Sequence, residues 1–170
     1  PRTATVATLH ALSAAHVSTI PFENLDVLLG AGIDLDPAVV EAKLVGARRG
    51  GYCFEHNSLL LHMLTALGFA ARPLSARVRL DRARDYTPAR THVFVRVDTV
   101  DDGPWLCDVG VGSMSLTGAL RLALDVEQAT PHEPRRLIAV GAWDGLTRRG
   151  PNARLFHRVR LGDGWREVCE

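Results

Sequence analysis

Apolar residues in the N-terminal part of the chain recur at the spacing of one face of a helix. One such stripe covers 6–20, and Pro21 closes it because the proline ring cannot continue a helix. A second stripe covers 36–49, and its opening Asp-Pro pair is typical of a helix start. A third begins near Cys53 and stops at Gly68, a residue that tolerates the left-handed turn after a helix. These patterns predict three helices.

From Ala71 onward the pattern changes to short β-rich runs, separated by turn signals such as DDG, WDG and GDG. The runs are PLSARVRL, THVFVRVDT, PWLCDVG, RRLIAVGAW, LFHRVRL and WREVCE. Short strands joined by tight turns favour an antiparallel sheet or barrel. We therefore predict an α+β fold in chain order, with a helical domain over 1–70 and an antiparallel β-barrel domain over 71–170.

Composition and charge exclude several classes of protein. The net charge is +1 and the arginines are scattered, so the chain lacks the basic stripe of a nucleic-acid-binding protein. No apolar run approaches the about 20 residues that a membrane-spanning helix needs. Three cysteines at unrelated spacings do not form a disulfide framework, which favours free thiols and a reducing compartment. We predict a cytoplasmic protein that binds neither nucleic acid nor membrane.

The decapeptide RRGGYCFEHN at 48–57 places a cysteine at the start of the third predicted helix. Unpaired N–H groups and the positive end of the helix dipole favour the thiolate form of a cysteine in this position. Gly50 and Gly51 would let the backbone turn sharply and a substrate approach closely, while the N–H of Cys53 would face an oxyanion. The alternative is a buried small residue after a glycine turn, since free cysteine is among the most buried residue types.

A nucleophilic thiol needs a base, and the base needs a group that orients it. In THVFVRVDT, alternation places the valines on one face of the strand and His92 on the other. In WLCDVGVG, Asp108 lies within an apolar strand, where a carboxylate is costly unless it is paired or hydrogen-bonded. The order Cys53, His92, Asp108 is compatible with a helix thiol that faces neighbouring strands. Taken singly, the histidine and the carboxylate also fit structural roles.

A metal site is the rival interpretation of these residues. Its available ligands are Cys53, His56, His62, Cys107 and His132. The set lacks a second closely spaced pair, and its spacing matches neither a zinc finger nor a zinc ribbon, so we predict no metal site. The glycine-rich stretch GVGSMSLTG matches neither a Walker loop nor a dinucleotide fingerprint, and by itself it indicates only a turn.

Four segments, IPFENLDVLLG, RRGGYCFEHN, RTHVFVRV and LCDVGVG, in this order resemble the arylamine N-acetyltransferase family of the bacterial, actinobacterial-like type. The resemblance runs from about Leu9 to the end of the chain, and the central decapeptide is its most specific part. It implies a helical bundle, a β-barrel and a third α/β lid domain, with a triad arranged as in thiol proteases. Because the lid is absent after Glu170 and the chain starts without methionine, we expect a fragment of a longer protein.

The resemblance also implies the chemistry. Cys53 is then the nucleophile, His92 the base and Asp108 the carboxylate that orients the base. The acetyl group of acetyl-CoA passes to the cysteine and then to an arylamine, arylhydrazine or hydrazide, which is a ping-pong reaction. Acetyl-CoA and small aromatic amines or hydrazines are the expected partners, and no cofactor is permanently bound.

Further residues receive roles from the resemblance alone. Arg49 is expected to pair with Glu23, with Asp26 as a further candidate, and to hold the turn beneath the nucleophile. The residues expected along the substrate and CoA cleft are Gly110, Val111, Gly112 and Ser113. Val111 departs from the family pattern, which usually has an aromatic residue between the two glycines.

Two alternatives stay open at the level of the sequence. A thiol peptidase or transglutaminase-like enzyme has the same Cys-His-Asp order but forms its acyl-enzyme from peptide amides. A non-catalytic, truncated homologue would have a Cys53 no more reactive than Cys107 or Cys169. The preferred amine and the oligomeric state are not determined by the sequence.

Overall fold

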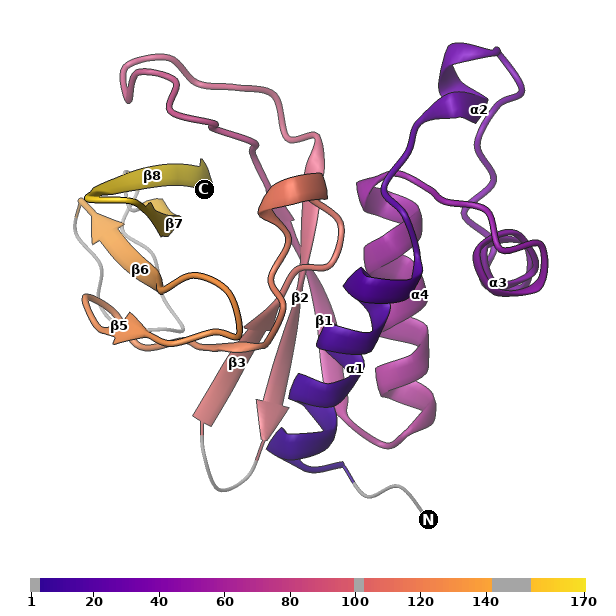
Figure 1. Cartoon of the computed structure of the whole chain (residues 1–170), viewed down its shortest axis with the longest axis horizontal. Helices are drawn as coiled ribbons and strands as arrows, with labels where there is room; N and C mark the ends of the chain where they lie inside the picture. The colour runs from indigo at the N-terminus through magenta and orange to yellow at the C-terminus, as the bar shows by residue number, and fades with distance from the viewer. Residues whose placement is uncertain (1–3, 100–102, 142–153) are drawn as a thin grey trace.

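The helices precede the strands in the chain, as Figure 1 shows for this computed structural model, which describes residues 4–99, 103–141 and 154–170. In chain order the helices are α1 (Val6–Thr19), α2 (Leu25–Leu28), α3 (Pro37–Glu41), the π-helical turn η1 (Ala42–Gly46) and α4 (Cys53–Ala66). The strands begin only after α4, so the predicted α+β class is confirmed.

Local sequence explains where most of the helices begin and end. Thr5 caps α1 through its hydroxyl, which accepts a hydrogen bond from the Thr8 N–H at 3.1 Å. The helix predicted over 36–49 is shorter and divided, because α3 passes into η1 and η1 ends at Gly46. Arg48 has a φ of 53°, which is left-handed and outside the helical range, so the predicted end at Arg49 is wrong. The short α2 was not predicted.

Within the described residues, eight strands form two antiparallel four-stranded sheets. The first contains β1 (Ala70–Ala76), β2 (His92–Thr99), β3 (Gly103–Cys107) and β4 (Leu120–Arg121) in this order. The second contains β5 (Glu127–Gln128), β6 (Arg135–Val140), β7 (Arg154–Leu161) and β8 (Gly164–Cys169). A 3-10 turn, η2 (Gly112–Met114), follows β3. All six predicted runs contain a strand, whereas the predicted turn WDG and most of DDG lie outside the described residues.

Single bridges join the two sheets at both edges, as in a barrel. Val78, which follows β1, pairs with Cys169 at the end of β8, and Leu124, which follows β4, pairs with Leu137 in β6. The first of these contacts is extended by Arg77, which exchanges two backbone hydrogen bonds with Glu170 at 2.7 and 2.9 Å. The end of the chain therefore lies against the start of the loop between β1 and β2.

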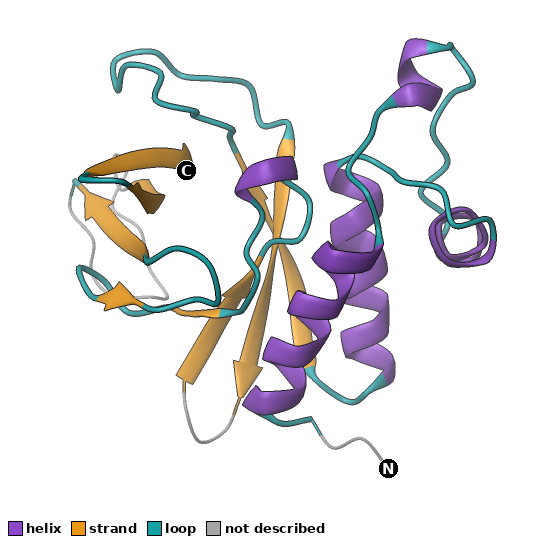
Figure 2. Ribbon diagram, viewed as in Figure 1, coloured by secondary structure: helices purple, strands orange, loops and turns teal. Residues whose placement is uncertain are grey.

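The first sheet has a core on each of its faces. Phe94 and Leu106 enter the cluster between the two sheets, whereas Val95 and Cys107 enter the cluster that packs against α1 and α4. Figure 2 shows these two helices side by side on one face of the sheet and the second sheet on the other. Burying one large aliphatic side chain such as Leu60, which is fully buried in α4, contributes about 1.5–3 kcal/mol. The alternation in β2 thus places His92 on the face that looks towards the second sheet.

No helix within 4–99, 103–141 and 154–170 is long and apolar enough to span a membrane.

Candidate active site

Cys53 is the first residue of α4, and only 9% of it is exposed. Its thiol donates a hydrogen bond to the Thr91 carbonyl at 3.3 Å, which brings the helix start to the residue before β2. Gly50 and Gly51 lie just before the helix, and both are buried. Neither has a positive φ, and a side chain at either position would meet the backbone of Pro21 or the carboxylate of Glu55. The space that we predicted a substrate would use beside these glycines is therefore filled by other parts of the protein.

His92 and Asp108 form a buried pair between the two sheets. His92 opens β2, Asp108 follows the last residue of β3, and His92 Nε2 lies 2.8 Å from Asp108 Oδ2. Their side chains are 1% and 0% exposed. The His92 ring also packs against Phe94 in a T-shaped pair, with the ring centroids 5.3 Å apart. The structure thus supplies the partner that the buried carboxylate of Asp108 requires.

Asn57 completes the surroundings of this carboxylate. Asp108 Oδ1 accepts hydrogen bonds from Asn57 Nδ2 and from the Gly110 N–H, each at 3.1 Å. Asn57 Oδ1 in turn accepts from the Val109 N–H at 3.1 Å. Since Asn57 follows Cys53 by one helical turn, it ties α4 directly to the loop that carries Asp108. The sequence interpretation missed Asn57, although its position one turn after the cysteine was a usable signal.

The charges of the pair stabilise one another. Burial by itself lowers the pKa of His92, but the charge of Asp108, its hydrogen bond and the neighbouring Cys53 outweigh burial and raise that pKa to about 9. Burial by itself raises the pKa of Asp108, but the charge of His92 and the hydrogen bonds from His92, Asn57 and Gly110 lower it. At neutral pH the pair is therefore an imidazolium beside a carboxylate.

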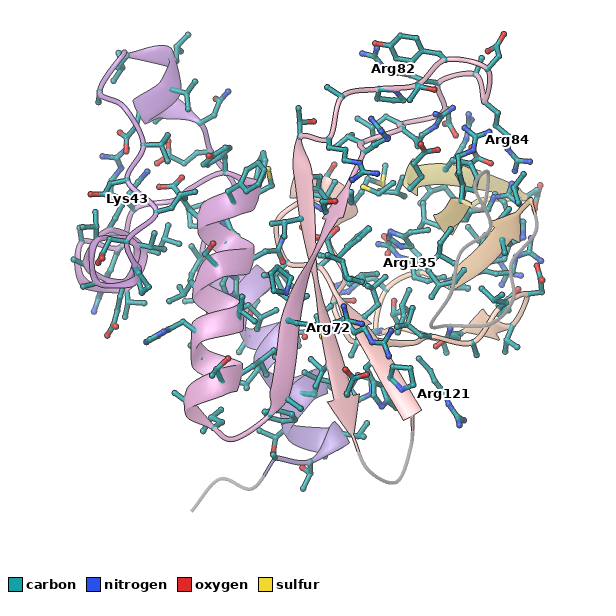
Figure 3. All side chains as sticks on the ribbon, turned by 180° about the vertical axis from the view of Figure 1, so that it is seen from behind. Lys43, Arg72, Arg82, Arg84, Arg121 and Arg135 are labelled. Carbon is teal, nitrogen blue, oxygen red and sulfur yellow. The ribbon has the colours of Figure 1, made fainter. Side chains whose placement is uncertain are left out.

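A second network of charges lies at the turn before α4. Arg49 bonds Glu23 and Asp26, each at 3.0 Å, and Lys43 bonds Asp26 at 2.6 Å and Glu55 at 2.7 Å. Hydrogen bonds from Lys43 and Arg49 lower the pKa of Asp26. Figure 3 shows Lys43 beside the start of α4. The structure brings Glu23 and Arg49 together, but Lys43 and Glu55 were missed, although Lys43 is the only lysine in the sequence.

The four residues expected along the cleft occupy different positions. Gly110 is buried against the backbone of Cys53, where a side chain would come within 2.9 Å of the cysteine Cα. Val111 packs against the core between the sheets. Gly112 and Ser113 line a cavity of about 270 Å³, whose wall also includes His56, and a neighbouring one of about 530 Å³. These two residues therefore face open space beside the site.

The ligands proposed for a metal site at the level of the sequence do not come together. His56 Nδ1 lies 2.9 Å from His16 Nε2, and His62 and His132 are exposed. Cys107 is buried on the helix face of the first sheet, where burial raises the pKa of its thiol to about 12. Within the part of the chain that the structure describes, the one group of three residues with metal-binding side chains is His92, Asp108 and Cys169.

Comparisons with known proteins agree with this architecture. Residues 5–149 match the model of the N-acetyltransferase family. An arylamine N-acetyltransferase and N-hydroxyarylamine O-acetyltransferase of Salmonella typhimurium is 48% identical over 138 residues, which are 81% of this chain and 48% of the relative. An arylamine N-acetyltransferase of Mycolicibacterium smegmatis is 47% identical over 156 residues, which are 90% of this chain and 54% of the relative.

Solved structures give the same result at the level of the fold. The arylamine N-acetyltransferase of M. tuberculosis superposes with a TM-score of 0.86 at 38% identity, over 99% of this chain and 59% of that one. The Mycobacterium marinum enzyme in complex with CoA superposes with a TM-score of 0.85 at 38% identity, over 99% of this chain and 59% of that one. This chain spans about half the length of the curated relatives that it matches. Fold, sequence and family model together show that the chain belongs to the arylamine N-acetyltransferase family.

Proposed function

We propose that this chain carries the acyl-transfer centre of an arylamine N-acetyltransferase, with Cys53 as nucleophile, His92 as base and Asp108 as orienting carboxylate. The observation that carries the proposal is that one buried histidine bonds the carboxylate and directly follows the residue that the Cys53 thiol bonds. His92 bonds Asp108 at 2.8 Å, and the Cys53 thiol, at the start of α4, bonds the carbonyl of Thr91, the residue before His92, at 3.3 Å. A thiol next to an oriented imidazole is the arrangement that nucleophilic catalysis by cysteine requires.

The first half-reaction would proceed from a thiolate–imidazolium pair. The Cys53 sulfur attacks the carbonyl carbon of acetyl-CoA, the carbonyl π electrons move to oxygen, and a tetrahedral intermediate forms. N–H groups at the start of α4, which lack acceptors within the helix, would face the oxyanion. The intermediate collapses as the bond to the CoA sulfur breaks, and the imidazolium of His92 gives its proton to the departing thiolate.

The second half-reaction would release the acetyl group. An arylamine, arylhydrazine or hydrazide attacks the acetyl-cysteine while His92 takes a proton from its nitrogen, and the Cys53 sulfur leaves as thiolate. Both the donor and the intermediate are thioesters, so the first step is nearly balanced in free energy, whereas the amide product makes the whole reaction favourable. Cysteine therefore suits this exchange better than serine.

The names of the relatives support the choice of substrates. They are arylamine N-acetyltransferases, and one solved relative is a complex with CoA. We carry acetyl-CoA over to this chain as a co-substrate rather than a resident cofactor, with small aromatic amines and hydrazines as acceptors. A cytoplasmic location stays a prediction.

Acetylation of the thiol tests the proposal directly. After incubation with acetyl-CoA, mass spectrometry of the intact chain and of its peptides should find one acetyl group, on Cys53. Cys107→Ala should be acetylated as the wild type is, because Cys107 lies in the core on the helix side of the first sheet. An acyl group taken up from peptide amides but not from acetyl-CoA would instead indicate a thiol peptidase or transglutaminase-like enzyme.

Alkylation separates thiol activation from donor binding. At neutral pH, iodoacetamide should modify Cys53 faster than Cys107 and Cys169, which are both fully buried. Because exposure alone would favour Cys53, the decisive comparison is with His92→Ala, which should remove most of the advantage. A Cys53 that reacts equally fast in folded His92→Ala would favour the non-catalytic homologue.

A further inference from the structure

The mechanism proposed above leaves one buried thiol beside the site without a role. Cys169 ends β8, is fully buried and faces the His92–Asp108 pair. One potential ligand atom of each of these three residues lies within 4.8 Å of the other two. The bridge between Cys169 and Val78, which joins the two sheets, holds the thiol at this position.

An imidazole nitrogen, a carboxylate oxygen and a thiolate sulfur are all ligands of Zn²⁺. Bonds of about 2.0–2.3 Å place the ligand atoms of a tetrahedral zinc site roughly 3.3–3.8 Å apart. The present separations range from 2.8 Å, between His92 and Asp108, up to a limit of 4.8 Å. The widest separation therefore exceeds that of a tetrahedral zinc site by only about 1 Å.

The net charge of the cluster also permits one Zn²⁺ ion to replace two protons. An imidazolium on His92, a carboxylate on Asp108 and a neutral thiol on Cys169 sum to zero. Zn²⁺ bound to a neutral imidazole, the carboxylate and a thiolate also sums to zero, because two protons leave as one metal ion enters. The neighbouring buried cation, Arg135, which Figure 3 shows between the two sheets, therefore meets no additional positive charge.

We propose that His92, Asp108 and Cys169 form a zinc-binding site that switches the Cys53 centre off. A metal ion on these residues displaces the proton that His92 holds and breaks the bond that orients its ring. The bound imidazole keeps one N–H, but as a neutral ring it is a far weaker acid towards a leaving thiolate than the imidazolium, and it no longer forms an ion pair with Cys53. The site is inhibitory and reversible, and the ion is not a cofactor of acetyl transfer.

Cobalt(II) serves as the spectroscopic probe, because its bond to a thiolate gives a charge-transfer absorption that Zn²⁺ lacks. The wild-type chain with Co²⁺ should show this absorption, and stoichiometric Zn²⁺ should abolish it. Cys169→Ser should lose the absorption and bind Zn²⁺ at least about 100-fold more weakly in a chelator competition, since a direct ligand matters at least as much as an outer partner. Cys107→Ser is the matched control, because that thiol is equally buried but lies on the other face of the first sheet, and it should bind as the wild type does.

Cys53→Ser distinguishes the proposed site from metal binding at the nucleophile. The variant should keep the cobalt absorption. Loss of the absorption in Cys53→Ser together with its retention in Cys169→Ser would overturn the proposal, as would a wild-type chain without any thiolate absorption. Circular dichroism checks that the variants fold, and Cys169→Ala provides a second substitution if the serine does not. These readouts do not depend on acetyl transfer, so they can fail while the proposed function stands.

Discussion

Two polar networks meet at the first turn of α4, and they differ in burial and in what they hold. The buried network of His92, Asp108 and Asn57 joins α4 to the first sheet and gives both oxygens of the carboxylate a hydrogen-bond donor. The ion-pair network joins the turn before α4 to the preceding helices. Its members are Glu23, Asp26, Lys43, Arg49 and Glu55. In this network the Arg49 side chain is 45% exposed, whereas His92 and Asp108 are almost completely buried.

The difference in burial gives the two networks different roles, one in reactivity and the other in stability. Burial strengthens each interaction of the first network and makes an unpaired member costly, so this network fixes the charge and the orientation of the groups around the thiol. Solvent screens the second network at Arg49, its most exposed member, and the network mainly fixes the path of the backbone into the helix. Substitutions in the first should mainly change reactivity, and substitutions in the second should mainly change stability.

The largest effect is expected from Asp108→Asn. The amide would orient the imidazole of His92 wrongly and would remove the charge that keeps it protonated, so acetylation of Cys53 should slow on the order of 10⁴-fold, as in the serine-protease triad. Rapid-quench mass spectrometry measures this rate. Asp98→Asn, at the other end of β2 from His92, is the control and should react as the wild type does. A fast Asp108→Asn variant would leave the buried network without a catalytic role.

Asn57→Ala tests whether the link between α4 and the Asp108 loop matters separately. The variant removes a donor from Asp108 and leaves the buried Val109 N–H unpaired, which should cost about 1–3 kcal/mol of the free energy of unfolding. Acetylation should slow by roughly 10- to 100-fold, as expected for a group that positions a catalytic residue. Asn24→Ala, an exposed residue before α2 without a side-chain capping bond, should change neither quantity. Equal rates in the two variants would limit Asn57 to a structural role.

The stability of the buried network should depend on pH. Since the pKa of His92 is raised to about 9, its contribution to stability is complete below its ordinary value of 6.5 and disappears as the pH rises through about 9. The pKa of Asp108 is lowered, so its contribution is complete above 3.8 and disappears on further acidification. The difference in the free energy of unfolding between wild type and Asp108→Asn should thus be largest from about pH 5 to 6.5 and shrink towards pH 9. Urea titrations measure it, and a constant difference across this range would contradict the ion pair.

The smallest effects are expected in the ion-pair network. Lys43→Met should lower the melting temperature more than Arg49→Met, because it leaves the Glu55 carboxylate, only 3% exposed, without its cation. Arg72→Met is the control, since its pair with Asp98 is exposed and should contribute almost nothing. If Glu23 and Arg49 act together, Glu23→Gln combined with Arg49→Met should be less damaging than the sum of the single changes. Additive losses would show that the pair has no coupling energy.

The sequence by itself determined the kinds of element and much of their extent. Helical periodicity with Pro21 and Gly68 as end signals located α1 and α4, and period-two alternation in THVFVRVDT placed His92 and the valines on opposite faces of β2. These patterns succeed because they arise from local sterics and from the burial of one face. They failed near Arg49, because η1 already ends at Gly46 and Arg48 adopts a left-handed φ.

Only the tertiary structure decided which side chains meet. The partners of Asp108 come from α4, from β2 and from its own loop, and nothing in the local sequence specifies these distances. Cys169 reaches the same place from the end of the chain, because the bridges between the sheets bring β8 beside β1. Local patterns determine which face a residue occupies, whereas the packing of distant segments determines what it faces there, so the surroundings of the thiol could not be deduced from the chain alone.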